Sequence, residues 1–256
     1  MGQPAALAFK AETMINFFRR IRKQFADDNK PLKYMRYAIG EILLVVVGIL
    51  IALSINNWNE ARKERLDTAA LMKNTQISIV EDIAQLNYQI ELLNHLKNRS
   101  ASALNIIERD EILSSESKMI LDSALLSIGR MGVNSSNLSM LEKLSSNNYL
   151  SFNHNSLLVE VNQIMDRIEE TKNLQGYFQQ NIMEKEMIIS HNTLRFNADN
   201  KPIYDFQKLK DDYTLFDVLL TSVKLQSGIT RRYIDIKERY GTLNQHIATI
   251  LKQIEY

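Results

Sequence analysis

Residues 37–59 constrain the fold of this chain more than any other segment. They read YAIGEILLVVVGILIALSINNWN and carry a single charged residue, Glu41. A helix rises about 1.5 Å per residue, so about 20 such residues cross the ~30 Å hydrocarbon layer of a bilayer. The sequence therefore predicts a transmembrane helix over residues 37–57, preceded by a tail over residues 1–36 and followed by one domain over residues 58–256.

The composition beyond the predicted span favours long helices. About 200 residues follow it, which is enough for one domain with a hydrophobic core. The chain has 3 Pro and 8 Gly, and neither type occurs between Gly48 and Gly129. Such a run lacks the residues that most often end a helix. The chain has no Cys, which excludes disulfides, thiolate catalysis and cysteine metal ligands.

Positive charge is concentrated on the N-terminal side of the span. Residues 1–36 hold eight Lys or Arg against three acidic residues. Because such an excess marks the cytoplasmic side, we expect an inner-membrane protein with a cytoplasmic N-terminus and a periplasmic C-terminal domain. A basic segment this short beside a span indicates contact with membrane lipid. It lacks the interleaved aromatics of a nucleic-acid binder, so we expect no nucleic acid as a partner.

Signal-peptide cleavage is the main alternative to an anchor. The apolar run over residues 42–51 has the length of a signal-peptide core, and Ala52-Leu53-Ser54 resembles a cleavage site. However, about 40 residues would precede that core, far more than signal peptides carry. The helical pattern also continues past Ser54, so we favour an uncleaved anchor.

Two groups of residues are candidate membrane-interface anchors. Residues 14–25 form an amphipathic pattern with apolar positions on one face and basic positions elsewhere. That pattern suits a helix lying in the inner leaflet, although an unordered basic tail fits it equally well. Trp58 stands at the opposite boundary, where an amphipathic ring is favoured. The basic anchors are Arg19, Arg22 and Lys23, and Met14 is an alternative start of the chain.

The segment from residue 14 to residue 60 also resembles a known family. The ADDNKP turn, the RYAIGE entry, the GILIAL core and the INNWNE exit occur in this order. Together they are similar to the N-terminal signature of a family of single-span Bacteroidota membrane proteins of unknown function. The resemblance is looser around residues 137–146, and residues 150–256 carry no motif of it. It implies an inner-membrane anchor with a helical outer domain, and no activity.

One face of the predicted span carries small and polar residues. Gly48 and Ala52 form a small-xxx-small pair, which lets two helix backbones approach closely. Glu41 and Asn59 fall on the same stripe, where a partner would shield them from lipid. We therefore predict an association face for a second copy or another envelope membrane protein. The alternative is a lipid-facing helix on which Glu41 reaches the headgroups.

The pattern beyond the span predicts an all-α fold. Apolar residues at spacings of three and four indicate long helices near 60–107, 156–194 and 211–255, and shorter ones near 117–128 and 136–144. Residues 197–202 read as a loop. A bend at Asn56-Asn57 and a continuous helix are both compatible with the sequence. We expect an N-terminal transmembrane helix followed by an elongated antiparallel helical bundle with coiled-coil-like packing.

The C-terminal segment contains the most regular pattern in the chain. Eight residues alternate at spacings of four and three, as the a and d positions of heptads do. We favour a place inside the chain's own bundle over a coiled coil with a partner, because flanking apolar residues widen the seam. The helix-packing seam is Ile229, Tyr233, Ile236, Tyr240, Leu243, Ile247, Ile250 and Ile254.

Chemistry-bearing motifs are absent from the sequence. The four His residues do not occur in HExxH, and none has Glu three positions before it, as di-iron bundles require. Neither a complete P-loop nor GxSxG occurs. We therefore expect no enzyme, no catalytic or metal site and no cofactor.

Two classes of function remain. The first is a structural, scaffold or adaptor role in the cell envelope. The second is an extracytoplasmic sensor or regulator that binds a ligand or envelope component and signals through a partner's span. About 36 cytoplasmic residues leave no room for an output domain, which favours the first class.

Overall fold

The computed structural model describes residues 31–109, 112–128, 130 and 138–254. The chain divides into two compact units, Met1–Arg62 and Lys63–Tyr256. Helix α2 (Pro31–Arg109) contributes to both units and includes the predicted span and the first outer helix. Asn56 and Asn57 have helical backbone. Helices make up most of the described residues, which confirms the all-α fold.

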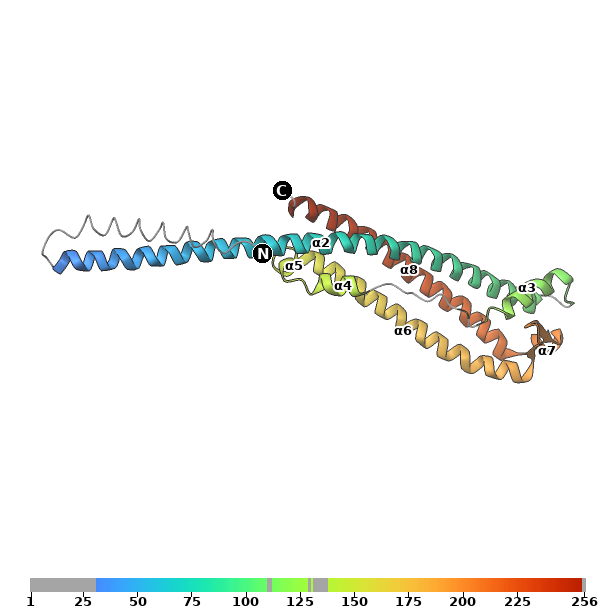
Figure 1. Cartoon of the computed structure of the whole chain (residues 1–256). Coiled ribbons are helices and arrows are strands. Elements are labelled where there is room, and N and C mark those ends of the chain that lie inside the picture. Colours follow the sequence, from blue (N-terminus) through green and yellow to red (C-terminus); the bar gives the residue numbers. More distant parts are fainter. Residues whose placement is uncertain (1–30, 110–111, 129, 131–137, 255–256) are drawn as a thin grey trace. The chain divides into compact units, whose positions relative to one another are not determined.

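The second unit is built from residues 63–109 of α2 together with α6 (Asn155–Asn192) and α8 (Tyr213–Ile254). Helix α8 runs antiparallel to α6, because Glu160 pairs with His246 while Gln175 bonds Tyr233 farther along. It also runs antiparallel to α2, as hydrogen bonds from Gln76 to Asn244 and from Tyr240 to Asp82 show. Consequently α2 and α6 run in the same direction (Figure 1).

Short helices cover the two ends of this bundle. Helices α4 (Leu138–Ser145) and α5 (Asn148–Asn153) pack at the N-terminal end of α6, whereas α3 (Ser115–Leu125) and α7 (Phe206–Lys210) lie at the other end (Figure 1). The side chain of Asn147 caps α5 by accepting from the Leu150 amide at 3.1 Å. Its amide group also donates to Thr68 of α2 at 3.2 Å. The cap on Leu150 and the contact with Thr68 together hold α5 in place against α2.

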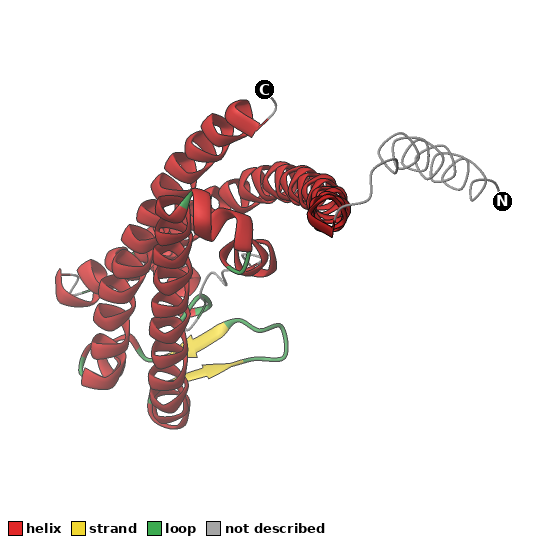
Figure 2. Cartoon of the chain, turned by 90° about the vertical axis from the view of Figure 1, so that its left-hand side faces the viewer, coloured by secondary structure: helices red, strands yellow, loops and turns green. Residues whose placement is uncertain are grey.

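A small hairpin joins α6 to α7 where the sequence predicts only a loop. Strand β1 (Leu194–Phe196) pairs antiparallel with β2 (Pro202–Tyr204), and Leu194 lies opposite Tyr204 (Figure 2). The Asn197 side chain accepts hydrogen bonds from the Asp199 and Lys201 amides and closes the turn. Asn200 has a positive φ of 58°, which Asn tolerates better than most residues.

The core of the second unit has two parts. One lies among α2, α4, α5, α6 and α8 and contains Met72, Ile164 and Tyr240. The other lies toward α3, α7 and β1 and contains Leu121, Phe178 and Leu219. The first seven residues of the C-terminal seam, Ile229 to Ile250, are at most 2% exposed, and Ile254 packs against the same cluster. The seam thus lies inside the chain's own bundle.

Candidate functional site

The surface of α2 in the first unit is strongly apolar. Large apolar side chains from Ile39 to Trp58 are all exposed. Among the described residues, α2 is the one helix that is long and apolar enough to cross a membrane. Such a surface is unfavourable in water, since burial of apolar area stabilises by about 25 cal/mol per Å². A lipid environment would satisfy it.

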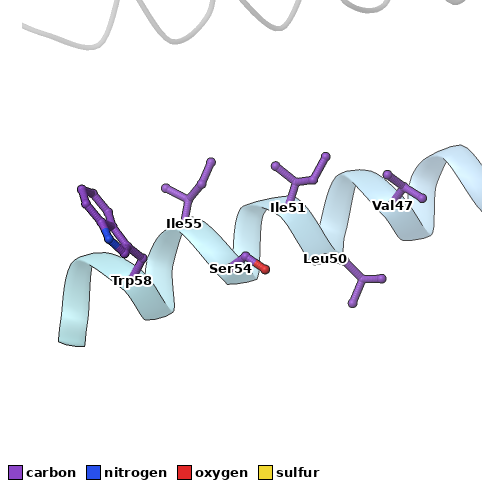
Figure 3. A pocket seen from close by; sticks show the side chains of 6 residues that line it. All are labelled: Val47, Leu50, Ile51, Ser54, Ile55 and Trp58. Carbon is purple, nitrogen blue, oxygen red and sulfur yellow. The ribbon is translucent and has the colours of Figure 1, made fainter. Parts of the chain in front are cut away.

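A shallow apolar pocket lies on this segment of α2. Figure 3 shows its lining side chains along successive turns. Ser54 supplies the only hydroxyl among them, so the pocket offers few groups that could orient a polar ligand. Its lining residues are Val47, Leu50, Ile51, Ser54, Ile55 and Trp58.

The predicted association face lies on the same helix. Glu41, Gly48, Ala52 and Asn59 are all exposed. A Cβ atom added to Gly48 would meet nothing within 4 Å, so the position stays open for the close approach of a second backbone. This face acts only when another helix packs on it, and it therefore stays a prediction.

Of the candidate interface anchors, the structure describes only Trp58. Trp58 is 60% exposed, and the guanidinium carbon of Arg62 lies 5.9 Å from its ring centroid. That distance fits a cation–π contact. Arg19, Arg22 and Lys23 lie outside the described residues, so their role also stays a prediction.

A buried polar pair joins α2 and α8 in the second unit. The Tyr240 hydroxyl donates to Asp82 Oδ2 at 3.0 Å, and both residues are buried. A carboxylate at this depth requires hydrogen bonds, because desolvation of an ionised group is costly. The pair therefore fixes the register of the two helices and is too enclosed to meet a substrate.

Two histidines and a glutamate gather near the N-terminal end of α6. His246 Nδ1 lies 3.0 Å from Glu160 Oε1. Burial lowers the pKa of His154, and the nearby His246 lowers it further. These residues do not form a metal site, and the described part of the chain has no group of three or more His, Cys, Asp and Glu that could hold an ion. Glu91 and His95, one turn apart on α2, are both exposed.

A third polar contact joins α3 to the hairpin. The Tyr204 hydroxyl donates to Asp122 Oδ1 at 2.6 Å, and Lys118 Nζ lies 2.9 Å from the same carboxylate. Lys118 Nζ also lies 5.0 Å from the Tyr204 ring centroid. Burial, followed by the hydrogen bond and the charge of Asp122, raises the pKa of Tyr204. The contact stabilises one end of the bundle.

Alkaline titration should distinguish Tyr204 from exposed tyrosines. We expect the Tyr204 phenol to remain protonated above pH 10, the ordinary pKa of a phenol. The protonated Tyr204 phenol contributes its full share to the free energy of unfolding below pH 10. This stabilisation is lost as the pH rises from 10 toward the raised pKa of Tyr204. Absorbance at 295 nm of the full chain measures the ionisation. Asp122→Asn should return Tyr204 toward the ordinary pKa; a titration identical to that of the parent chain would contradict this assignment.

The fold and these surfaces define a class: an α-helical bundle protein in which one of the described helices is long and apolar enough to cross a membrane. The model of a family of unknown function, DUF6090, matches residues 41–176, more than half of the chain. The chain belongs to this family. The matched region contains the apolar segment of α2, the short helices α3 to α5 and the first part of α6. No curated protein and no solved structure matches the chain.

Proposed function

We propose that the chain is a single-span inner-membrane protein whose outer helical bundle is a scaffold or adaptor for other envelope proteins. The exposed apolar segment of α2 carries the proposal, because its length and composition fit the hydrocarbon layer. The basic residues before it favour a cytoplasmic N-terminus. The resemblance of residues 14–60 to single-span membrane proteins, drawn from the sequence, implies an inner-membrane anchor with a helical outer domain.

The surface of the outer bundle favours binding of proteins. Several large apolar side chains are exposed far from the span in sequence, among them Tyr88, Met119 and Phe152. Exposed aromatic and methionine side chains are enriched at protein–protein contacts. Partly exposed ion pairs such as Arg167–Asp235 join α6 to α8 at the bundle surface, and Arg239 pairs with the same carboxylate. A preformed bundle of this kind presents its surface residues at fixed spacings, as an adaptor requires.

Chemical crosslinking in native membranes tests the proposal. The tagged full chain is crosslinked in cells, purified from the membrane fraction and analysed by mass spectrometry, with an untagged strain as the control. We expect a defined set of envelope proteins to be enriched over that control. Recovery of the chain without other proteins would contradict the adaptor role. In that case, a ligand that raises the melting temperature of the outer bundle would favour a sensor.

A further inference from the structure

Helix α2 carries a second apolar surface on the side away from α6 and α8. We call it the outer stripe; it consists of Leu66, Ala70, Ile77, Val80, Ala84 and Tyr88. All six residues are exposed, the four large ones by 59–64%. Residues between them, such as Met72, Ile79 and Leu86, are buried in the core. Within the second unit, α2 therefore has one buried seam and one open stripe.

The spacing of the outer stripe fits another helix. Positions 66, 70, 73, 77, 80 and 84 alternate at intervals of four and three, and Lys73 is the one polar residue among them. This is the repeat of a coiled-coil seam. The exposed large apolar residues of α6, Val159, Tyr177, Met183 and Ile188, follow no such interval. The regular repeat thus distinguishes the outer stripe from the exposed apolar residues of α6.

We propose that a second copy of this chain packs its outer stripe against this one, with the two α2 helices parallel. This rests on the proposed membrane anchor, because a single span gives every copy the same orientation and depth. The same residues of two copies then meet at the same level, as a two-fold symmetric interface requires. Leu66 faces Leu66, and Ile77 faces Ile77 of the other copy.

One further feature favours a second copy as the occupant. Asn59, the last residue of the predicted association face, precedes Leu66 by only seven residues. A dimer held through its spans would therefore bring the two outer stripes to a high local concentration. Lys73 places one charged layer in the seam, which costs stability. Two Ala and one Lys make the seam weak, so it depends on the shared membrane.

Single-cysteine crosslinking tests this interface, because the parent chain has no Cys. Leu66→Cys and Ala84→Cys are introduced separately into the full chain and oxidised in native membranes. We expect a disulfide-linked species of twice the chain mass from each variant. Lys172→Cys on α6 and Thr249→Cys on α8 are the controls, since both positions are exposed and lie outside the outer stripe. They should remain monomeric.

A second substitution checks that the outer stripe itself brings the thiols together. Ile77→Glu combined with Ala84→Cys should lower the yield of dimer about tenfold, because like charges would face each other in the seam. Dimer yields at residues 66 and 84 no higher than at residues 172 and 249 would overturn the proposal. An adduct with a protein of another mass would also overturn it.

The membrane pellet of each sample distinguishes this inference from the proposed function. A chain that sediments with membranes but yields no dimer overturns the dimer interface and leaves the anchor intact. A chain recovered in the soluble fraction overturns both. A dimer in the pellet supports the parallel pair.

Discussion

Replacement of Tyr240 by alanine is expected to destabilise the outer bundle by about 3–5 kcal/mol. The ring is fully buried in the core between α2 and α8, and large aromatic truncations in cores cost this much. For a unit of this size the loss lowers the melting temperature by about 6–20 °C. Circular dichroism at 222 nm of the full chain in detergent, followed with temperature, measures the change.

A matched tyrosine on the same helix provides the control. Tyr213 is 89% exposed, so Tyr213→Ala should change stability by about 0.5 kcal/mol or less. Tyr240→Phe keeps the ring and removes only the donor to Asp82, and we expect a loss of about 1–3 kcal/mol. Equal melting temperatures for Tyr240→Ala and Tyr213→Ala would show that α8 does not pack as described.

Two arginines in the apolar segment of α2 should remove the chain from the membrane. On insertion scales an arginine near the centre of a span costs about 2.5–3.5 kcal/mol, so Val46→Arg with Leu50→Arg costs about 5–7 kcal/mol. We expect most of the double variant to leave the membrane pellet or to be degraded. Western blotting of pellet and supernatant after alkaline carbonate extraction measures the distribution.

The control for this variant adds the same charge elsewhere. Met119→Arg with Phe152→Arg places two arginines at exposed apolar positions of the second unit. This pair should leave the chain in the pellet. If the Val46 and Leu50 double variant also remains there in full, α2 does not anchor the chain through this segment.

Periodicity predicts only part of the packing seam of α8. The a/d spacing predicts the packing residues from Ile229 to Ile254. In the structure, the same spacing continues upstream through Gln226 and Ser222 to Leu219 and Leu215, all of them buried. The sequence pattern hides this extension because two of its positions are polar. Ser222 tolerates burial since its hydroxyl donates to the Val218 carbonyl at 2.7 Å.

Elements fixed by distant contacts were beyond the sequence pattern. The strands β1 and β2 have three residues each, too few to show alternation. Helix α5 is six residues long and relies on the contact of Asn147 with Thr68, 79 residues away in the chain. Asp82 interrupts an apolar pattern, and its partner Tyr240 lies 158 residues later. Such pairs become visible only when the helices are placed side by side.

The candidate site, too, could be predicted only in part from the sequence. Glu41, Gly48, Ala52 and Asn59 were chosen by helical spacing, and their exposure on α2 leaves the face available. The outer stripe follows the same kind of repeat. The spacing also predicts a packing seam on α2 through Met72, Ile79 and Leu86, and their burial confirms it. The exposure of the second repeat, which includes Ile77, could not be predicted from spacing alone.

The most direct test of a membrane-anchored bundle is thiol labelling in intact spheroplasts. Lys172→Cys gives the full chain a single exposed thiol on α6. With the chain in the membrane and its bundle outside the cytoplasm, a membrane-impermeant maleimide should label this thiol without lysis. Labelling that appears only after lysis, or a chain that does not sediment with membranes, would contradict the account.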